Sequence, residues 1–328
     1  MKDIRAKLNS VKKVSIGCFP TPVHRITNFE KELNYKKIYI KRDDLTGVGP
    51  GGNKIRCLEY IFQEALDKKA DTILVSGPVQ SNLCTIAACA CRKMNFDCIS
   101  IFNGDKPEDI KGNMLLDELI SSDAHYIGKV TEEDRSKYVD ELNMKLKNEG
   151  KNPYIIKNGA STGYGAMGYV NAIIELQQQC WDLNIGIKEI FAPGANGGVA
   201  AGLIYGNALL GSPFKINIIS VEYENKILNE NIMEIIKEIE AITDIPFNYN
   251  LKNVCNLVDD YRGMGWGLNT DESKEMVFDF PKKEGVFIEN IYTSKVLVGM
   301  FDLIKKSKVN GSVCFIHTGG FGSLFGQF

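Results

Sequence analysis

The sequence predicts an α/β protein with two open, twisted and mainly parallel sheets covered by helices. From residue 36 onward, short β-rich runs alternate with segments whose apolar residues follow the helical period, as in strand–helix–strand units. The glycine-rich loops discussed below each follow such a run, at the expected carboxyl end of a strand. In open α/β sheets, ligands bind at that end of the strands.

The first series of alternating elements ends near residue 156. Thr131 is expected to be an N-cap, because acidic residues at 132–134 follow it as in the first turn of a helix. The expected strands are 38–40, 72–76, 98–102, 125–130 and 154–156, and the expected helices are 54–67, 81–94, 109–120 and 131–147.

Residues 159–168 contain four glycines and are expected to form a loop that returns the chain between two sheets. Residues 245–292 give no clear assignment. We expect a larger domain formed by 1–56 and 163–328, with 57–162 inserted as a smaller α/β domain. The second series has expected strands at 189–192, 216–221 and 313–316, and expected helices at 169–180, 200–210, 226–239 and 294–306.

The composition is that of an ordinary water-soluble protein. The 328 residues are 44% hydrophobic and 24% charged, with a formal net charge of −2. A chain of this length and hydrophobic content can form the cores of about two domains. Lys and Arg are scattered, so no nucleic-acid surface is expected, and no apolar run approaches the ~20 residues of a membrane span. The start Met1–Arg5 lacks a signal-peptide core, and the expected location is the cytoplasm.

The cysteines and histidines do not predict a metal site. Nine cysteines are an odd number, and most lie in apolar stretches, so we expect them to be reduced. Cys89 and Cys91 are one residue apart in an expected helix and would point away from each other. The three histidines are isolated in sequence. A cofactor without metal is therefore expected.

The segment Gly51-Gly52-Asn53-Lys54 is the first candidate for chemistry. The apolar period that begins at Ile55 places Lys54 in the first turn of a helix. Helix N-termini carry partial positive charge, so the ammonium form of a lysine is disfavoured there. A lysine biased toward its neutral amine suits imine formation with an aldehyde. Taken alone, the segment is explained as well by a solvated lysine beside a turn.

The loop Gly194–Val199 is a candidate phosphate site. It lies between an expected strand and an expected helix, and its glycines allow an anion to approach free backbone N–H groups. No Lys-Ser/Thr pair follows, so it is not a nucleotide P-loop, and the spacing does not fit the dinucleotide fingerprint. The alternative is a tight strand-to-helix turn.

Two further loops carry hydroxyl groups. Ser81 in Gln80-Ser81-Asn82 is a natural helix N-cap, and the hydroxyl, the amide and the free N–H groups could instead bind a carboxylate or a phenolate oxygen. Thr318 in the segment 317–320 could hydrogen-bond a ring nitrogen or a substrate without adding charge. That segment could also be only a turn.

With these loops in order, the sequence resembles the pyridoxal-phosphate enzymes of the tryptophan-synthase-β-like fold, also called fold type II. Within that fold it is similar to the family of D-cysteine desulfhydrase and 1-aminocyclopropane-1-carboxylate (ACC) deaminase. The resemblance covers nearly the whole chain. Its motifs are KRDDLTG (41–47), GGNK-x-R-x-LE (51–59), QSN (80–82), GAS-x-x-x-GAMGY (159–169), GGVAAGL (197–203), EG (284–285), IYTSK (291–295) and HTGG (317–320).

The resemblance implies pyridoxal 5'-phosphate bound between the domains, a small amino-acid substrate and a homodimer. Lys54 would form the internal aldimine, Asn82 would bond the phenolate oxygen, and Lys54, Ser81 and Tyr292 would be catalytic. The cofactor phosphate would lie against Ala195, Asn196, Gly197, Gly198 and Val199. The substrate would contact Ser81, Asn82, Leu83, Trp266, Tyr292 and Thr318.

One position favours a desulfhydrase over a deaminase. The deaminases carry a glutamate directly after the tyrosine that matches Tyr292, where it meets the pyridine nitrogen, and this chain has Thr293. A neutral hydroxyl makes the ring a weaker electron sink than a carboxylate does. That favours loss of a good leaving group from Cβ over opening of an unactivated ring. Thr318 also resembles the desulfhydrase form.

The chain departs from the family pattern at four positions. Ala195 replaces a usual glycine, and Val199 replaces a usual threonine whose hydroxyl bond to phosphate is worth ~1 kcal/mol. Leu83 replaces a usual His or Gln, and Trp266 stands where a family tyrosine is expected. Leucine removes a polar contact and tryptophan cannot deliver a phenol proton, so the substrate could be bulkier or less polar at Cβ than cysteine.

The first hypothesis is a lyase that eliminates a β-substituent, with D-cysteine converted to pyruvate, sulfide and ammonia. ACC deamination and β-replacement are alternatives in the same fold. A cofactor-binding protein without turnover is an alternative of another class. A doubly wound nucleotide-binding domain has no fingerprint to support it.

Overall fold

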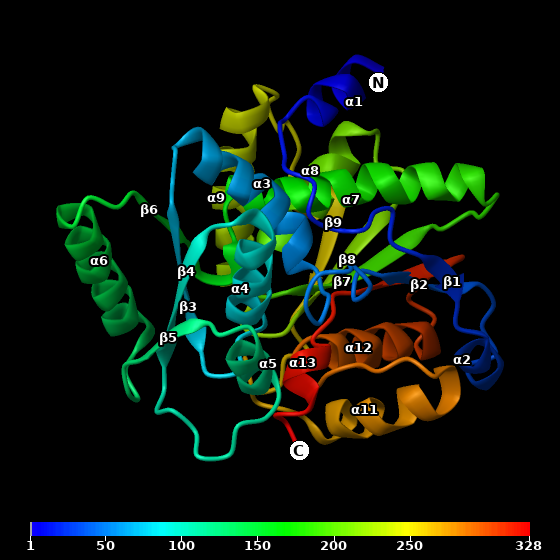
Figure 1. The fold of residues 1–328 in the computed structure, drawn as a ribbon. Helices are drawn as coiled ribbons and strands as arrows, with labels where there is room; N and C mark the ends of the chain where they lie inside the picture. Colours follow the sequence, from blue (N-terminus) through cyan, green and yellow to red (C-terminus); the bar gives the residue numbers. More distant parts are fainter. Residues whose placement is uncertain (1) are drawn as a thin grey trace.

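The computed structural model describes residues 2–328, and it contains two sheets with helices on both faces (Figure 1). The six-stranded sheet has the order β1-β2-β10-β7-β8-β9, and only its β1–β2 pair is antiparallel. The four-stranded sheet has the order β5-β4-β3-β6 and is parallel throughout. The predicted α/β class with two mainly parallel sheets is confirmed.

The strands of the larger sheet flank those of the smaller sheet in sequence. The smaller sheet consists of β3 (Thr72–Pro78), β4 (Asp97–Asn103), β5 (Asp123–Tyr126) and β6 (Pro153–Ile156). The predicted domain boundaries at 56/57 and 162/163 are compatible with this division and stay a prediction. The larger sheet consists of β1 (Val23–Arg25), β2 (Ile38–Arg42), β7 (Glu189–Gly194), β8 (Lys215–Ser220), β9 (Cys255–Val258) and β10 (Val313–His317).

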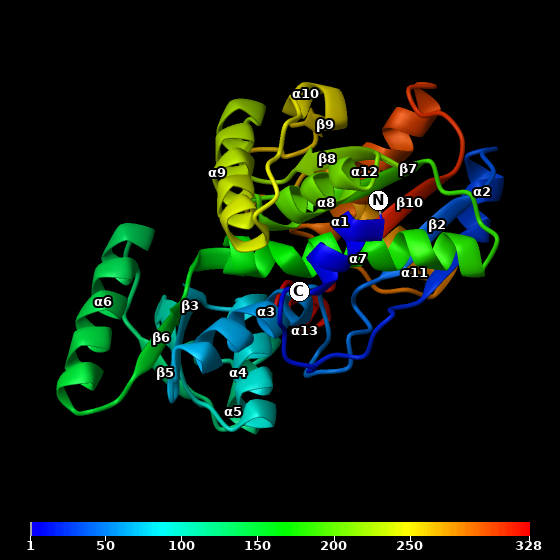
Figure 2. The same ribbon diagram turned by 90° about the horizontal axis from the view of Figure 1, so that it is seen from above.

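Helices cover both faces of each sheet (Figures 1 and 2). On the smaller sheet, α6 (Glu132–Asn148) covers one face, and α4 (Asn82–Met94) covers the other with α3 (Lys54–Asp67) and α5 (Asn113–Leu119) beside it. The larger sheet has α7 (Gly163–Asp182), α8 (Gly198–Leu209) and α9 (Asn225–Thr243) on one side and α11 (Asp271–Glu284) and α12 (Thr293–Lys305) on the other. The shorter helices are α1 (Lys2–Asn9), α2 (Thr27–Glu32), α10 (Leu251–Val254) and α13 (Phe321–Leu324).

Each sheet buries an apolar layer on both faces, as parallel strands require. In the larger sheet, β10 pairs with β2 on one side and β7 on the other, so Phe315 lies opposite both Ile40 and Phe191. All three side chains are fully buried against α12 and its neighbours. The opposite face packs on α7, α8 and α9. This two-sided burial holds the carboxyl ends of the strands in fixed positions.

The structure corrects three predicted elements. Residues 159–168 are not all loop: a single 3₁₀ turn spans Asn158–Ala160 and α7 begins at Gly163, capped by the Thr162 hydroxyl. Small residues fit there because a Cβ at Gly168 would lie 2.5 Å from the backbone of Arg56 on α3. The helix predicted at 109–120 begins only at Asn113. The strand predicted at 125–130 is β5, at 123–126.

Elements without a prediction are short or lie in the segment that gave no assignment. These are α1, β1, α2, α10, β9, α11 and α13. Within residues 2–328, none of the helices combines the length and apolar character needed to cross a membrane.

Candidate active site

A cavity of about 350 Å³ opens where the carboxyl ends of strands from both sheets meet. The smaller sheet contributes the segments after β3 and β6 and the last residue of β4, and the larger sheet contributes the segments after β7, β8 and β10. This is the place where open α/β sheets bind ligands. Twelve of the thirteen predicted site residues line the cavity: Lys54, Ser81, Asn82, Leu83, Ala195, Asn196, Gly197, Gly198, Val199, Trp266, Tyr292 and Thr318.

Lys54 is the first residue of α3, as its sequence context predicts. Its Nζ donates a hydrogen bond to the carbonyl oxygen of Gly159 at 2.7 Å across the cavity. Burial lowers the pKa of Lys54 below its ordinary value, and no carboxylate forms a salt bridge with it among the described residues. A larger fraction of neutral amine is therefore present near neutral pH than for a solvated lysine.

The loop before Lys54 is fixed by backbone contacts. Gly52 donates its N–H to the Thr46 hydroxyl at 3.0 Å, and the hydroxyl donates back to the Gly52 carbonyl at 3.0 Å. The N–H of Asn53 donates to the carbonyl of Thr318 at 2.9 Å. A Cβ at Gly51 would lie 2.0 Å from the carbonyl oxygen of Asp44, and φ there is +73°, so only glycine fits. The start of α3 is thus joined to both β2 and β10.

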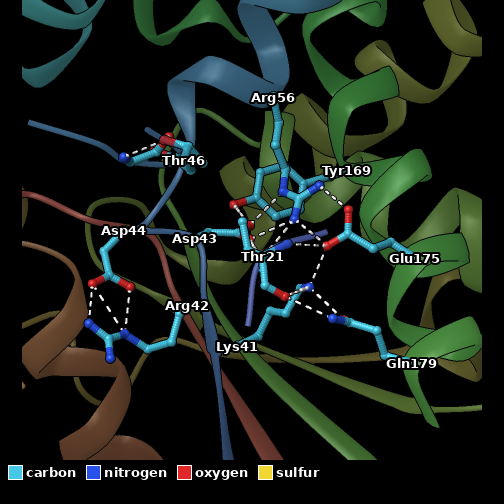
Figure 3. Close-up of polar contacts among 12 residues, drawn as sticks. Thr21, Lys41, Arg42, Asp43, Asp44, Thr46, Arg56, Tyr169, Glu175 and Gln179 are labelled. Atoms are coloured by element: carbon cyan, nitrogen blue, oxygen red, sulfur yellow. Dashed lines mark hydrogen bonds and ion pairs between the residues drawn. The ribbon is translucent and has the colours of Figure 1, made fainter. Parts of the chain in front are cut away.

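A buried charge network holds the same turn from the other side (Figure 3). Arg56, two residues after Lys54, donates through Nε and Nη2 to Asp43 at 2.8 Å each and through Nη1 and Nη2 to Glu175 at 3.0 and 2.8 Å. Lys41 also pairs with Glu175, and Tyr169 donates to Asp43 at 3.0 Å. These bonds tie α3 to the end of β2 and to α7.

The network keeps its carboxylates ionised. Burial alone would raise the pKa of Asp43, but the Arg56 guanidinium, Lys41 and the Thr21 hydroxyl together hold it below its ordinary value. The pKa of Glu175 is likewise lowered against the effect of burial, through Arg56 and Lys41. Bidentate guanidinium–carboxylate geometry gives both orientation and strength, so the position of Lys54 is fixed by charge-assisted bonds.

Ser81 is the N-cap of α4, and its Oγ accepts a hydrogen bond from the N–H of Cys84 at 3.3 Å. The capping interpretation is therefore confirmed. The hydroxyl proton is not used by this bond, so Ser81 can still donate to a ligand in the cavity. Because α4 begins here, its first N–H groups have no carbonyl partner within the helix and suit a carboxylate.

The loop 195–199 leads into the N-terminus of α8, a buried helix. The first bond inside that helix runs from the N–H of Ala201 to the carbonyl of Gly197 at 2.8 Å, so the N–H groups of residues 198–200 have no partner in the helix. Gly197 adopts φ +94°, which turns the chain into the helix. Free N–H groups and the helix dipole at one point favour the binding of an anion.

Thr293 is the predicted site residue that does not line the cavity. Its side chain is fully buried, and its hydroxyl accepts from the N–H of Glu289 at 2.8 Å and donates to that residue's carbonyl or carboxylate, each at 3.0 Å. The Glu289 carboxylate also accepts from the N–H groups of Ile291, Tyr292 and Thr293. Thr293 therefore stabilises the start of α12, and its contact with the cofactor ring stays a prediction.

The cavity has further lining residues that sequence reasoning missed. Glu132 and Arg135 come from α6, Asn103 is the last residue of β4, and Glu222 follows β8. Arg135 is held by the Asn103 carboxamide at 2.5 Å, and burial raises the pKa of Glu222. Residues 158–161, including the Gly159 carbonyl that faces Lys54, follow β6. Their position after a strand was the available signal.

The residues present fit pyridoxal phosphate. The buried amine of Lys54 suits an aldehyde, the unpartnered N–H groups at the start of α8 suit a phosphate, and the amide of Asn82 suits a phenolate oxygen. All three groups open into one cavity. Within residues 2–328, no group of three or more His, Cys, Asp or Glu side chains is placed to hold a metal ion.

Comparisons with known proteins agree with this chemistry. The family model described as pyridoxal-phosphate dependent enzyme matches residues 14–319. A Pyrococcus abyssi protein provisionally named 1-aminocyclopropane-1-carboxylate deaminase is 31% identical over 322 residues, which are 98% of this chain and 96% of that protein. The D-cysteine desulfhydrase of Salmonella schwarzengrund is 31% identical over 313 residues, 93% of each chain.

The fold comparison leads to the same family. The crystal structure of an ACC deaminase homologue superimposes with a TM-score of 0.91 at 31% identity, covering 99% of this chain and 97% of that one. Fold type II is thereby confirmed, and so is pyridoxal phosphate as the cofactor. The chain belongs to the pyridoxal-phosphate dependent enzymes, in the family that includes ACC deaminases and D-cysteine desulfhydrases.

Proposed function

We propose that this enzyme eliminates a β-substituent from a small amino acid, with D-cysteine as the first choice. The balanced reaction is D-cysteine plus water to pyruvate, hydrogen sulfide and ammonia. The observation that carries the proposal is the buried Lys54 amine facing a cavity that also contains anion-binding helix ends. A base of lowered pKa beside a bound carboxylate is what removal of a Cα proton requires.

Each group has a defined task in this proposal. Bound pyridoxal phosphate supplies an electron-withdrawing ring that stabilises negative charge at Cα. Lys54 would hold the cofactor covalently through Nζ, and the same Nζ, when free, would take the Cα proton of the substrate. Ser81 and the first turn of α4 hold the substrate carboxylate. Tyr292 donates its phenol proton to the sulfur that leaves Cβ.

ACC deamination is the second candidate, and relatives of both names support the two activities equally. We place elimination first because the residue after Tyr292 is a threonine, where the deaminases carry glutamate. Its hydroxyl is engaged by Glu289, so it adds no charge to the cavity. Leu83 and Trp266 line the cavity, and their apolar surfaces suit a leaving group that is less polar than a thiol.

A substrate panel tests the proposal. The purified holoenzyme is incubated with D-cysteine, L-cysteine, β-chloro-D-alanine or ACC, and keto acid, sulfide and ammonia are measured. We expect pyruvate and sulfide in equal amounts from D-cysteine. 2-Oxobutyrate from ACC without pyruvate from D-cysteine would establish the second candidate. A thioether product formed only with an added thiol would indicate β-replacement, and an intact cofactor spectrum without any product would indicate binding without turnover.

We also propose a cytoplasmic homodimer. All nine cysteines are free, as a reducing compartment would keep them.

The dimer is supported by an apolar surface formed by three phenylalanines. Phe321 packs on both Phe287 and Phe325, and each of the three side chains is at least 44% exposed. Light scattering on the purified protein, compared with a Phe325→Glu variant, measures the mass directly. A wild-type mass equal to that of one chain would contradict the dimer.

A further inference from the structure

Asn113 is a fully buried side chain at the first position of α5, outside the cavity lining. Its Nδ2 donates two hydrogen bonds, to the carbonyl oxygen of Gln80 at 2.9 Å and to Oδ1 of Asn82 at 2.8 Å. Its backbone N–H donates to Oε1 of Gln80 at 2.8 Å. Three bonds therefore connect the start of α5 to the segment that carries Ser81 and Asn82.

These contacts determine which way both amides point. A backbone carbonyl only accepts, so the group of Asn113 that faces Gln80 must be its NH₂. An NH₂ group only donates, so the atom of Asn82 that faces it must be the carbonyl oxygen Oδ1. With Oδ1 occupied, the remaining polar group of the Asn82 side chain is its NH₂, and Asn82 lines the cavity.

We propose that Asn113 is a positioning residue that orients the Asn82 amide with its NH₂ toward the cofactor. The inference rests on the proposed role of Asn82 as the partner of the phenolate oxygen. That oxygen is an acceptor, so an NH₂ group there is attractive and an amide oxygen there is repulsive. Without Asn113 the Asn82 amide could rotate by half a turn and present either end.

The surroundings of Asn113 restrict it to this arrangement. Gln80 lies at φ +72°, and its Nε2 donates to the carbonyl of Lys111 at 2.9 Å, so its side chain is fixed at both ends. A Cβ at Gly322 would lie 2.1 Å from Oδ1 of Asn113, so α13 approaches closely and closes the space beside the amide. Asn113 cannot turn away from Asn82 without moving α13 or the 80–82 segment.

The test compares Asn113→Ala, Asn82→Ala and the double variant as purified holoenzymes. The readouts are the pH midpoint of the cofactor absorption spectrum and the Kd of pyridoxal phosphate from titration. Loss of a donor to the phenolate oxygen raises its proton affinity. We expect both single variants to move the pH midpoint upward and to weaken cofactor binding by about tenfold. The double variant is expected to match Asn82→Ala, because Asn113 acts through Asn82.

Two further variants separate positioning from general stability. Asn113→Asp keeps the size of the side chain but replaces its donor by an acceptor. We expect it to shift the spectrum as Asn113→Ala does. This variant keeps the test decisive if the alanine variant does not fold. Asn207→Asp is the matched control, since Asn207 is a fully buried amide that bonds only the backbone of Phe214. It should lower thermal stability and leave the spectrum unchanged.

The outcomes are distinguishable. An unchanged spectrum and Kd in folded Asn113→Ala and Asn113→Asp, beside a shifted Asn82→Ala, would overturn the positioning role alone. An unchanged Asn82→Ala would overturn the proposed role of Asn82 and the positioning role with it. An additional shift in the double variant would show that Asn113 acts independently of Asn82, which also overturns the inference.

Discussion

The indole N–H of Trp266 donates a hydrogen bond to the phenol oxygen of Tyr292 at 2.6 Å in the wall of the cavity. The two residues are 26 positions apart, and Trp266 stands where a family tyrosine is expected. Burial raises the pKa of Tyr292, and the bond from Trp266 opposes that rise in part. Because tryptophan only donates, the phenol proton must point elsewhere. Tyr292 is left as a donor toward the cavity.

Trp266→Phe is therefore expected to slow the proposed elimination by about fivefold, since a hydrogen bond of ~1 kcal/mol that orients the phenol is lost. Cofactor affinity should stay the same. The decisive measurement is kcat in a double-mutant cycle with Tyr292→Phe. If Trp266 acts through Tyr292, its replacement has no further effect once the phenol is absent. Equal effects in both backgrounds would show that the indole acts on its own.

Asp43→Asn is expected to lower the free energy of unfolding by about 3 kcal/mol or more, because it leaves Arg56 and Lys41 buried with only the Glu175 carboxylate as counter-charge. Urea unfolding of the wild type and the variant measures the difference. Glu118→Gln removes an exposed partner of Lys106 and serves as the control, with an expected change below about 0.5 kcal/mol. Equal losses in the two variants would contradict the role of the network.

Asp117 predicts a pH dependence of stability. It is 3% exposed, neither of its oxygens has a hydrogen-bond partner among the described residues, and burial raises its pKa to about 7. The folded protein therefore keeps a proton on Asp117 that the unfolded chain releases near pH 4. The contribution of this proton to the free energy of unfolding is complete below about pH 4 and is lost as the pH rises to about 7.

Between about pH 5 and pH 8, the wild type should lose roughly 2 to 3 kcal/mol of unfolding free energy more than Asp117→Asn does. Urea unfolding at the two pH values measures both losses. The variant keeps a neutral side chain of the same shape, so its curve lacks this contribution. Parallel pH dependence in the two proteins would mean that the Asp117 carboxyl titrates normally.

Local sequence patterns predicted the elements that carry strong apolar periods. The helix predicted at 54–67 has the observed bounds of α3, because a glycine turn precedes a regular apolar stripe. The loops after β7 and β10 were also found, since glycine-rich segments after buried strands are visible in the sequence. The predicted start of α5 was too early. Gly112 ends the preceding loop at φ +62°, and it adopts this conformation only in its tertiary context.

The supporting contacts could not be predicted in the same way. Asn113 bonds Asn82 from 31 residues away, and Arg56 bonds Glu175 from 119 residues away. Each of these side chains is an unremarkable helix residue until the fold brings its partner to it. For Thr293, the motif position predicted a ligand contact, whereas its hydrogen bonds with Glu289 at the start of α12 could not be predicted from the motif.

The identity of the reactive lysine can be checked against a close competitor. Lys295 is fully buried, and its burial lowers its pKa to about 8. It belongs to the same motif as Tyr292. Its Nζ, however, donates to the carbonyl oxygens of Arg262 at 2.8 Å and Gly265 at 2.9 Å, and it does not line the cavity. Lys54 has one carbonyl partner and opens onto the cavity.

Borohydride reduction of the holoenzyme followed by peptide mass spectrometry distinguishes the two lysines, because reduction fixes the cofactor to the lysine that holds it. We expect a pyridoxyl label on Lys54 alone and a folded Lys54→Ala protein without the visible cofactor band. A label on Lys295 or any other lysine, or an unchanged band in Lys54→Ala, would contradict the assignment of Lys54 as the reactive lysine.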